Sequence, residues 1–165
     1  MIARLHAPNP RRHLLTVLVV ALAGCGSGRD QLLAEKVAQA EAAAQRACSY
    51  LIELGHEKIG MVAALSAHND RASARVLGVK RALEHSNLAW HPEWYIEVPY
   101  HLDDARQAAR TVLSLKEKPT AIVCGNDVIA YGVMLAALRL GLRVPGDLSV
   151  MGFDDLEWSR HLSPS

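Results

Sequence analysis

Two pairs of polar residues, each directly after a short apolar run, are the first candidates for chemistry in this sequence. Asn126 and Asp127 form one pair, and Asp154 and Asp155 form the other. Ligands of open α/β sheets bind where parallel strands end, so polar side chains at two strand ends favour one shared site. An asparagine both donates and accepts hydrogen bonds, and a carboxylate accepts charge-assisted bonds from hydroxyl groups. These residues therefore predict recognition of a small polar ligand.

The two pairs belong to a strand–helix–strand unit within residues 118–155. Residues 120–124 and 148–153 are short, apolar and rich in β-branched side chains, as buried parallel strands are. The helix between them begins at Asp127, which we expect to be its N-cap, and is closed by Gly141. Its predicted buried face consists of Ile129, Val133, Met134, Ala137 and Leu138.

The same alternation of helix and strand extends upstream. A helix before Gly55, a strand over 58–64, a helix over 70–86, a strand around 95–98 and a helix over 102–115 complete the order. The predicted apolar face of the helix over 70–86 consists of Ala74, Leu77, Gly78 and Ala82. This alternation predicts the α/β class, a doubly wound parallel sheet of about four strands with helices on both faces.

The residues from Pro119 to Asp155 also carry a family resemblance. Their sequence, PTAIVCGNDVIAYGVMLAALRLGLRVPGDLSVMGFDD, resembles the effector-sensing core of LacI/GalR-type bacterial transcriptional regulators, which has the periplasmic-binding-protein-like type I fold. The resemblance covers residues 44–165 and implies the carboxyl-terminal lobe of a two-lobed clamshell. In that family the ligand closes the lobes and shifts the DNA-binding state of a dimer. We expect a truncated sensing domain, without the first lobe or the DNA-binding headpiece.

The resemblance implies that Arg75, Tyr100, Asn126 and Asp154 contact the ligand. The guanidinium of Arg75 offers several fixed donors to sugar hydroxyls or to a carboxylate, although a solvated arginine on a helix face is the alternative. The ring of Tyr100 can pack on the apolar face of a sugar or, alternatively, against the sheet edge. Asn126 has the alternative role of sharing the helix cap with Asp127.

No catalytic, metal or cofactor site is predicted. Adjacent strand residues project in different directions, so Asp154 and Asp155 do not form an acid–base pair, and Asp155 is assigned a structural role. The sequence has no GxSxG, P-loop or GxGxxG motif after a strand. A metal held by Asp127 with these two aspartates is a minor alternative that lacks a further ligand. We therefore expect a binding protein and not an enzyme.

The first 43 residues differ in character from the rest. Residues 1–25 combine three arginines, a short apolar run over 14–23 and the sequence Leu-Ala-Gly-Cys ending at Cys25, which resembles the lipobox of bacterial lipoproteins. That resemblance implies a lipid on Cys25 and anchoring to a membrane. Residues 26–43 indicate a short tether and an alanine-rich helix, which we expect to be solvated; a partner-binding coiled coil is the alternative.

The composition gives no sign of a strongly basic nucleic-acid-binding module. The 165 residues include 18 basic and 17 acidic side chains, and the three cysteines lack CxxC or zinc spacing. The first interpretation is a sugar-sensing domain that forms a homodimer through this lobe, with DNA bound only by full-length relatives. One alternative is a lipid-anchored periplasmic sugar-binding lipoprotein. We expect the chain in the cell envelope if the leader is used and in the cytoplasm if it is not. Another is a truncated fusion without a function.

Overall fold

The computed structural model describes residues 28–163. The predicted signal segment with Cys25 lies outside the described residues, as do Gly26 and Ser27 of the predicted tether. The chain divides into two compact units at Lys36, and the second unit contains the whole sheet. Among the described residues, no helix is both long and apolar enough to cross a membrane.

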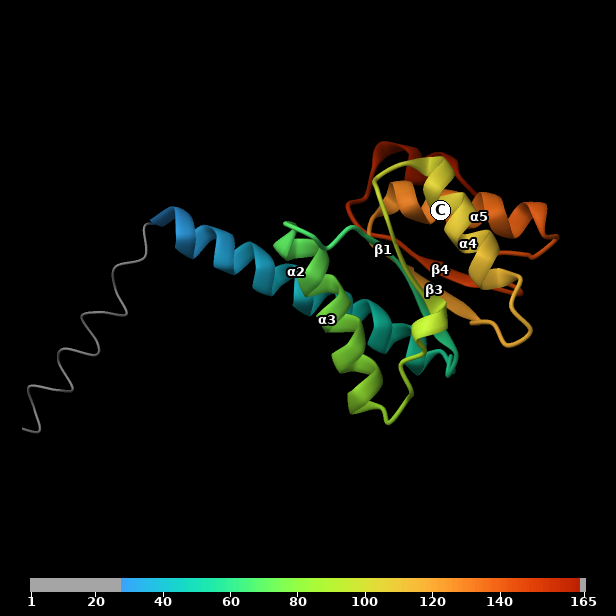
Figure 1. Cartoon of the computed structure of the whole chain (residues 1–165), viewed down its shortest axis with the longest axis horizontal. Coiled ribbons are helices and arrows are strands. Elements are labelled where there is room, and N and C mark those ends of the chain that lie inside the picture. The colour runs from blue at the N-terminus through green and yellow to red at the C-terminus, as the bar shows by residue number, and fades with distance from the viewer. Residues whose placement is uncertain (1–27, 164–165) are drawn as a thin grey trace, which may run out of the picture. The chain divides into compact units, whose positions relative to one another are not determined.

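The second unit is built on four parallel strands, which confirms the predicted α/β class (Figure 1). They are β1 (Ile59–Ala64), β2 (Tyr95–Val98), β3 (Ala121–Cys124) and β4 (Ser149–Met151), in the spatial order β2-β1-β3-β4. The chain runs from β1 outward to β2 and then crosses to β3 on the other side of β1. The carboxyl ends of β1 and β3 therefore flank a topological switch point, where open α/β sheets bind ligands.

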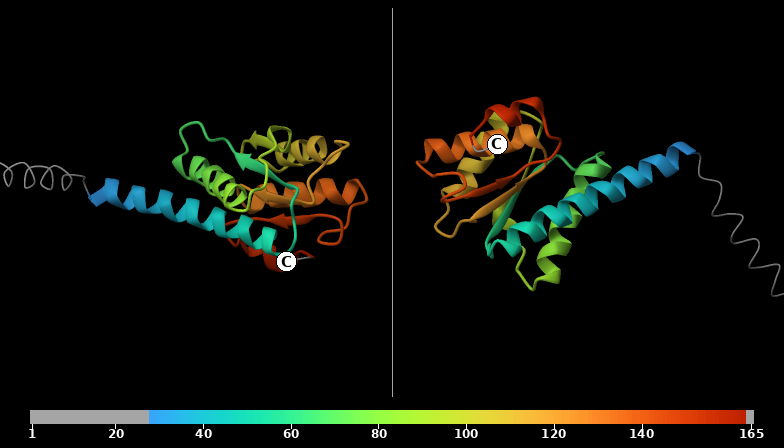
Figure 2. Two further views of the ribbon diagram at one scale, coloured as in Figure 1. Left: turned by 90° about the horizontal axis from the view of Figure 1, so that it is seen from below. Right: turned by 180° about the vertical axis from the view of Figure 1, so that it is seen from behind.

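Helices cover both faces of the sheet (Figures 1 and 2). One face packs against α4 and α5, and the other packs against α3 and the carboxyl-terminal half of α2. Successive strand residues alternate between the two layers, so Val62 packs with the first pair of helices and Met61 with the second. The remaining elements are α2 (Gly28–Glu53), α3 (Asp70–His85), η1 (Pro92–Trp94), α4 (Leu102–Leu113), α5 (Asp127–Arg139) and η2 (Glu157–His161).

The alanine-rich segment and the helix before Gly55 form one continuous helix, α2, and not two elements. Ala40 and Ala44 are buried, so the prediction of a solvated helix is wrong for this part of α2. A Cβ atom added to Gly78 of α3 would lie 2.2 Å from the carbonyl oxygen of Glu41. The two helices therefore approach to backbone contact, and small side chains fill the interface between them.

The buried face of α5 differs from the predicted one. Ile129, Val133 and Ala137 are buried as expected, but Leu138 is 72% exposed and Met134 is only partly buried. The helix is apolar around most of its circumference, so the periodicity of its sequence could not identify the side that faces the sheet. An exposed apolar surface on α5 is the result.

The predicted apolar face of α3 also needs a correction. Leu77 is exposed, whereas Val79 is fully buried. Ala74, Gly78 and Ala82 are buried as expected. The buried face of α3 is therefore the side that carries Val79. Arg75 lies one turn before Val79 on this side, so its side chain reaches the carboxyl ends of the strands.

Candidate ligand-binding site

Arg75 reaches from α3 to the ends of two strands. Its Nη1 donates a hydrogen bond of 3.0 Å to the carbonyl oxygen of Gly125, after β3. Its Nη2 donates one of 3.2 Å to Oδ1 of Asp154, after β4, and the guanidinium lies 5.0 Å from the centroid of the Phe153 ring. The structure thus brings together two of the four predicted ligand-contacting residues, which are 79 positions apart in the sequence.

This ion pair retains hydrogen-bonding capacity. The side chain of Asp154 is 45% exposed, and that of Arg75 is 15% exposed. The Nε atom of Arg75 is buried without a hydrogen-bond partner among the described residues. A buried donor left unpaired costs about 1–3 kcal/mol. The exposed carboxylate of Asp154 is therefore the part of the pair that a polar ligand can reach directly.

A strained turn positions the carboxylate of Asp154. The φ angles of Asp154 and Asp155 are 104° and 49°. Residues with side chains adopt such positive values at a cost of about 1–3 kcal/mol each, and the values persist only where neighbouring contacts hold them. Non-glycine residues in these conformations cluster at ligand sites, so the turn itself supports a binding role for this edge.

The N-cap of α5 is Asn126 and not Asp127, which corrects the prediction. Oδ1 of Asn126 accepts a hydrogen bond of 2.9 Å from the backbone N–H of Ile129, and the backbone of Asn126 is extended, as an N-cap requires. Asn126 is only 7% exposed. The side-chain oxygen Oδ1 of Asn126 is therefore already bonded to the backbone of the helix. The alternative of a capping role, raised from the sequence, is the one that the structure supports.

Tyr100 lies apart from the Arg75–Asp154 pair. Its hydroxyl accepts a hydrogen bond of 3.2 Å from Nδ2 of Asn69, the N-cap of α3. Tyr100 follows β2 and Asp154 follows β4, which are the two outer strands of the sheet. Its side chain is exposed, and its hydrogen bond ties it to the start of α3 and not to the ion pair.

A polar cluster at the end of β1 was not predicted from the sequence. The backbone N–H and the hydroxyl of Ser66 donate hydrogen bonds of 2.9 and 2.8 Å to the carboxylate of Glu97, which also accepts a bond from the Tyr95 hydroxyl. Burial opposes ionisation of Glu97, but the bonds from Tyr95 and Ser66 outweigh it and lower its pKa. A glutamate inside the predicted strand over 95–98 was the only sequence signal for this cluster.

Metal coordination finds no support at this edge. Among residues 28–163, no three His, Cys, Asp or Glu side chains are grouped so that they could hold a metal ion. The carboxylate of Asp127 accepts bonds from the backbone N–H of Leu156 and the hydroxyl of Ser159. It is therefore engaged with the segment after Asp155 and does not cluster with Asp154 and Asp155.

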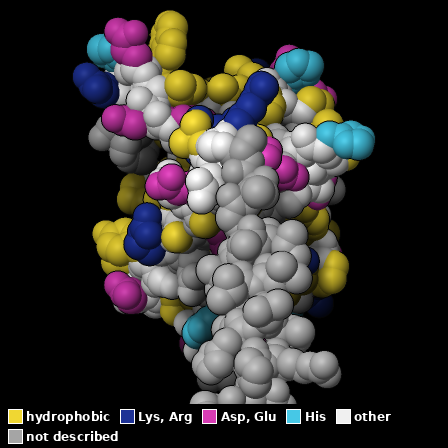
Figure 3. All heavy atoms as spheres, turned by 90° about the vertical axis from the view of Figure 1, so that its left-hand side faces the viewer, with side chains coloured by type: hydrophobic (Ala, Val, Ile, Leu, Met, Phe, Trp, Pro, Cys, Tyr) yellow, Lys and Arg dark blue, Asp and Glu magenta, His cyan; other side chains and the backbone are white. Residues whose placement is uncertain are grey.

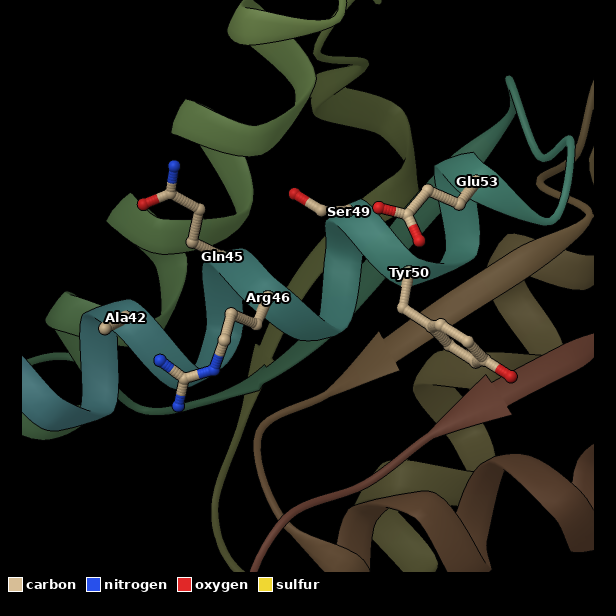
Figure 4. A pocket seen from close by; sticks show the side chains of 6 residues that line it. All are labelled: Ala42, Gln45, Arg46, Ser49, Tyr50 and Glu53. Atoms are coloured by element: carbon tan, nitrogen blue, oxygen red, sulfur yellow. The ribbon is translucent and has the colours of Figure 1, made fainter.

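Hollows are also found away from this edge. Six residues of α2, among them Arg46, Tyr50 and Glu53, line a hollow of about 450 Å³ (Figure 4). All of them come from one helix, and none was predicted to bind a ligand. A larger apolar groove of about 880 Å³ lies along α5 and the segment that contains η2. We call it the α5 groove; Leu135, Leu138, Tyr131, Trp158 and Leu162 are among the residues that line it.

Charges are mixed on the surface. On the part of the face in Figure 3 that the described residues form, basic and acidic side chains are interspersed. The whole sequence has a net charge of +1. The described residues on this face therefore do not form a basic stripe of the kind that nucleic-acid-binding surfaces have.

Known proteins resemble this chain in sequence and in fold. The sequence model for the periplasmic binding protein-like domain matches residues 48–165. The HTH-type transcriptional repressor PurR of Vibrio vulnificus is 41% identical over 120 residues, which are 72% of this chain and 35% of the repressor. The chain thus spans about a third of the length of this curated relative.

Two solved structures have the same fold. A regulatory protein of the LacI family from Chloroflexus aggregans superposes with a TM-score of 0.73 at 29% identity, covering 76% of this chain and 45% of that one. A sugar-binding transcriptional regulator of the LacI family from Escherichia coli, complexed with phosphate, gives 0.72 at 25% identity and covers 75% and 44%.

The Glu97 cluster predicts a specific dependence of stability on pH. A carboxyl group whose pKa is lowered by folding stabilises the protein above its unfolded value, near 4.5, and this contribution is lost as the pH falls through the lowered value. We expect Glu97→Gln to be less stable than wild type at pH 7 and to lose less stability between pH 5 and about pH 3. Urea unfolding at several pH values measures this, with the exposed Glu84→Gln as the control. Parallel pH profiles for wild type and Glu97→Gln would contradict it.

Proposed function

Because the chain belongs to the periplasmic binding protein-like domain family, we propose that it is the effector-binding domain of a LacI-type transcriptional regulator and that it binds a small polar molecule. The observation that carries this proposal is the Arg75–Asp154 pair at the carboxyl edge of the sheet. Residues from α3, from the end of β3 and from the end of β4 converge there beside a topological switch point. Full-length relatives are repressors and regulators, so DNA binding is proposed only for a protein that also has a DNA-binding module.

We propose a sugar as the class of ligand. The site offers fixed N–H donors on Arg75 and an exposed carboxylate on Asp154, which together suit neighbouring hydroxyl groups. The ring of Phe153, which lies beside Arg75, can supply apolar contact for the carbon face of a sugar. The similar regulator from Escherichia coli, which is described as sugar-binding, agrees with this choice of class.

We propose that two copies of the chain associate through the α5 groove. Leu138 and Trp158 are each 72% exposed, and the groove that they line is predominantly apolar. Large exposed apolar patches mark interaction surfaces in soluble proteins. A symmetric dimer would bury the same patch on both copies, which is the commonest arrangement of homo-oligomers.

A lipid-anchored binding protein is a second candidate, favoured by the basic flank, the apolar run over 14–23 and the position of Cys25. Ligand recognition would use the same residues, whereas the output would be uptake or sensing at the membrane. The two candidates therefore differ in where the protein resides and not in the site.

Ligand binding is tested by NMR titration of the full chain with D-ribose, D-galactose, D-glucose and inorganic phosphate. We expect a saturable shift of the backbone amides near Arg75 and Asp154 with at least one sugar, because its hydroxyls would bond to both groups. Arg75→Lys loses the fork of donors and should bind that sugar at least tenfold more weakly (about 1.4 kcal/mol). The exposed Arg71→Lys on the same helix is the control.

Two outcomes would contradict the assignment. Saturation by phosphate alone would exclude a sugar as the ligand class. Equal affinity of wild type and Arg75→Lys for the bound sugar would remove Arg75 from the binding site.

Association through the α5 groove is tested by sedimentation velocity over a range of protein concentrations. We expect wild type to form dimers and Leu138→Glu to be monomeric, because a buried unpaired carboxylate at the interface is strongly unfavourable. Leu54→Glu, which places the same charge at an exposed leucine outside the groove, should leave the dimer intact. A Leu138→Glu variant that still forms dimers would exclude this surface.

The leader is tested by expression in a bacterium, with intact mass and membrane fractionation of wild type and Cys25→Ala. If Cys25 is lipidated, we expect a cleaved, heavier-than-unmodified mature chain in the membrane fraction for wild type only. A wild-type chain that keeps residues 1–25 and stays in the soluble fraction would contradict lipid anchoring.

A further inference from the structure

The carboxylate of Asp127 holds the segment that follows β4. Its Oδ2 accepts hydrogen bonds of 2.8 Å from the backbone N–H of Leu156 and of 3.2 Å from the hydroxyl of Ser159. The backbone N–H of Asp127 donates one of 2.9 Å to the carbonyl oxygen of Phe153. A single residue at the start of α5 therefore holds this segment on both sides of Asp154.

The two bonds nearest to Asp154 enclose the strained turn. Phe153 immediately precedes the two residues with positive φ, and Leu156 immediately follows them. Such a backbone conformation persists only where its surroundings impose it. The contacts of Asp127 with Phe153 and Leu156 are the restraints on either side, so they determine where the carboxylate of Asp154 lies relative to Arg75.

The backbone around Asp127 is shaped to admit its side chain. A Cβ atom added to Gly152 would lie 2.3 Å from Oδ1 of Asp127. Any residue other than glycine at position 152 would therefore displace the carboxylate. Asp127 is itself only 7% exposed, so it cannot serve as a direct contact for a ligand in the solvent-accessible part of the site.

The same carboxylate is also connected to the α5 groove. Ser159, which donates to Asp127, lies 3.0 Å from the hydroxyl of Tyr131, and Tyr131 lines the groove. Leu156, whose N–H bonds to Asp127, lines the groove as well, and so does Trp158 between the two bonded residues. One buried acidic side chain therefore lies between the ligand-binding edge and the apolar surface.

We propose that Asp127 is a positioning residue that fixes Asp154 for ligand binding and, through Leu156 and Ser159, couples that site to the α5 groove. The inference rests on the proposed function, because it takes the Arg75–Asp154 pair as the ligand site and the groove as the dimer surface. A ligand that moves the carboxylate of Asp154 as it bonds to it also moves the turn that Asp127 holds through Phe153 and Leu156. Coupling of this kind is reciprocal, so association at the groove changes ligand affinity by the same factor.

The test uses the full chain and needs no ligand. Its first readout is the side-chain Nε–Hε NMR signal of Arg75, with Asp154→Asn supplying the signal of the broken pair. Its second is hydrogen exchange of the Leu156 amide, compared with the core amide of Val62. The variants are Asp127→Ala and the milder Ser159→Ala. The matched control is Glu157→Gln, an exposed acidic residue of the same segment outside the strained turn.

We expect Asp127→Ala to move the Arg75 signal towards that of Asp154→Asn and to increase exchange at Leu156 at least tenfold, with Val62 unchanged. Ser159→Ala should shift both readouts in the same direction by a smaller amount, and it keeps the test decisive if Asp127→Ala does not fold. Glu157→Gln should change neither. An unchanged Arg75 signal in Asp127→Ala would overturn the proposal; if that variant does not fold, the same result in Ser159→Ala would do so. Equal loss of protection at Leu156 and Val62 would also overturn it, because the variant would then be destabilised throughout.

Sedimentation of the same variants tests the coupling to the groove. We expect the dimer dissociation constant of Ser159→Ala to rise at least threefold, and that of Glu157→Gln to match wild type. A rise of the same size in both variants, or in neither, would overturn the coupling. If wild type is monomeric, the proposed dimer and the coupling both fail, while the Arg75 signal still reports separately on the positioning of Asp154.

Discussion

The guanidinium of Arg75 is bonded at once to the end of β3 and to the end of β4, and the geometry of the ligand-binding edge depends on this double contact. A flexible lysine could neutralise Asp154, but it could not hold a backbone carbonyl and a carboxylate in one plane. The contact also explains why the strained turn after β4 has a defined direction. The carboxylate of Asp154 is attracted to the guanidinium of Arg75, which is itself held by the carbonyl oxygen of Gly125 and the ring of Phe153.

Close packing behind the sheet gives Arg75 this position. α2 and α3 meet at Gly78 with almost no side chain between them, which holds α3 against the sheet three residues after Arg75. Because both faces of the sheet are buried, polar groups can face solvent only at the two ends of the strands. At the opposite, amino ends of the strands, the ring of His56 lies 2.9 Å from the hydroxyls of both Thr120 and Ser149, so this side chain links the starts of β3 and β4.

The fold class and the site were predictable to different degrees. Alternation of short apolar runs with helices indicated the α/β class, because each strand is buried on both faces. Because α5 is apolar around most of its circumference, its sequence did not show which side faces solvent, and Leu138 was therefore placed in the core. Asn126 and Asp127 both suit an N-cap, and only the backbone conformation separated their roles. The contact between Arg75 and Asp154 is a tertiary one that no local pattern encodes. The family resemblance implied only that each of the two residues contacts the ligand.

A double-mutant cycle on ligand affinity tests the central claim most directly. Arg75→Lys, Asp154→Asn and the double variant would be titrated with whichever sugar wild type binds. If both side chains contact one ligand as a unit, the loss in the double variant should be smaller than the sum of the two single losses by at least 0.5 kcal/mol. Losses that add within about 0.3 kcal/mol would show that the two residues act independently, and the pair would then not be the binding site.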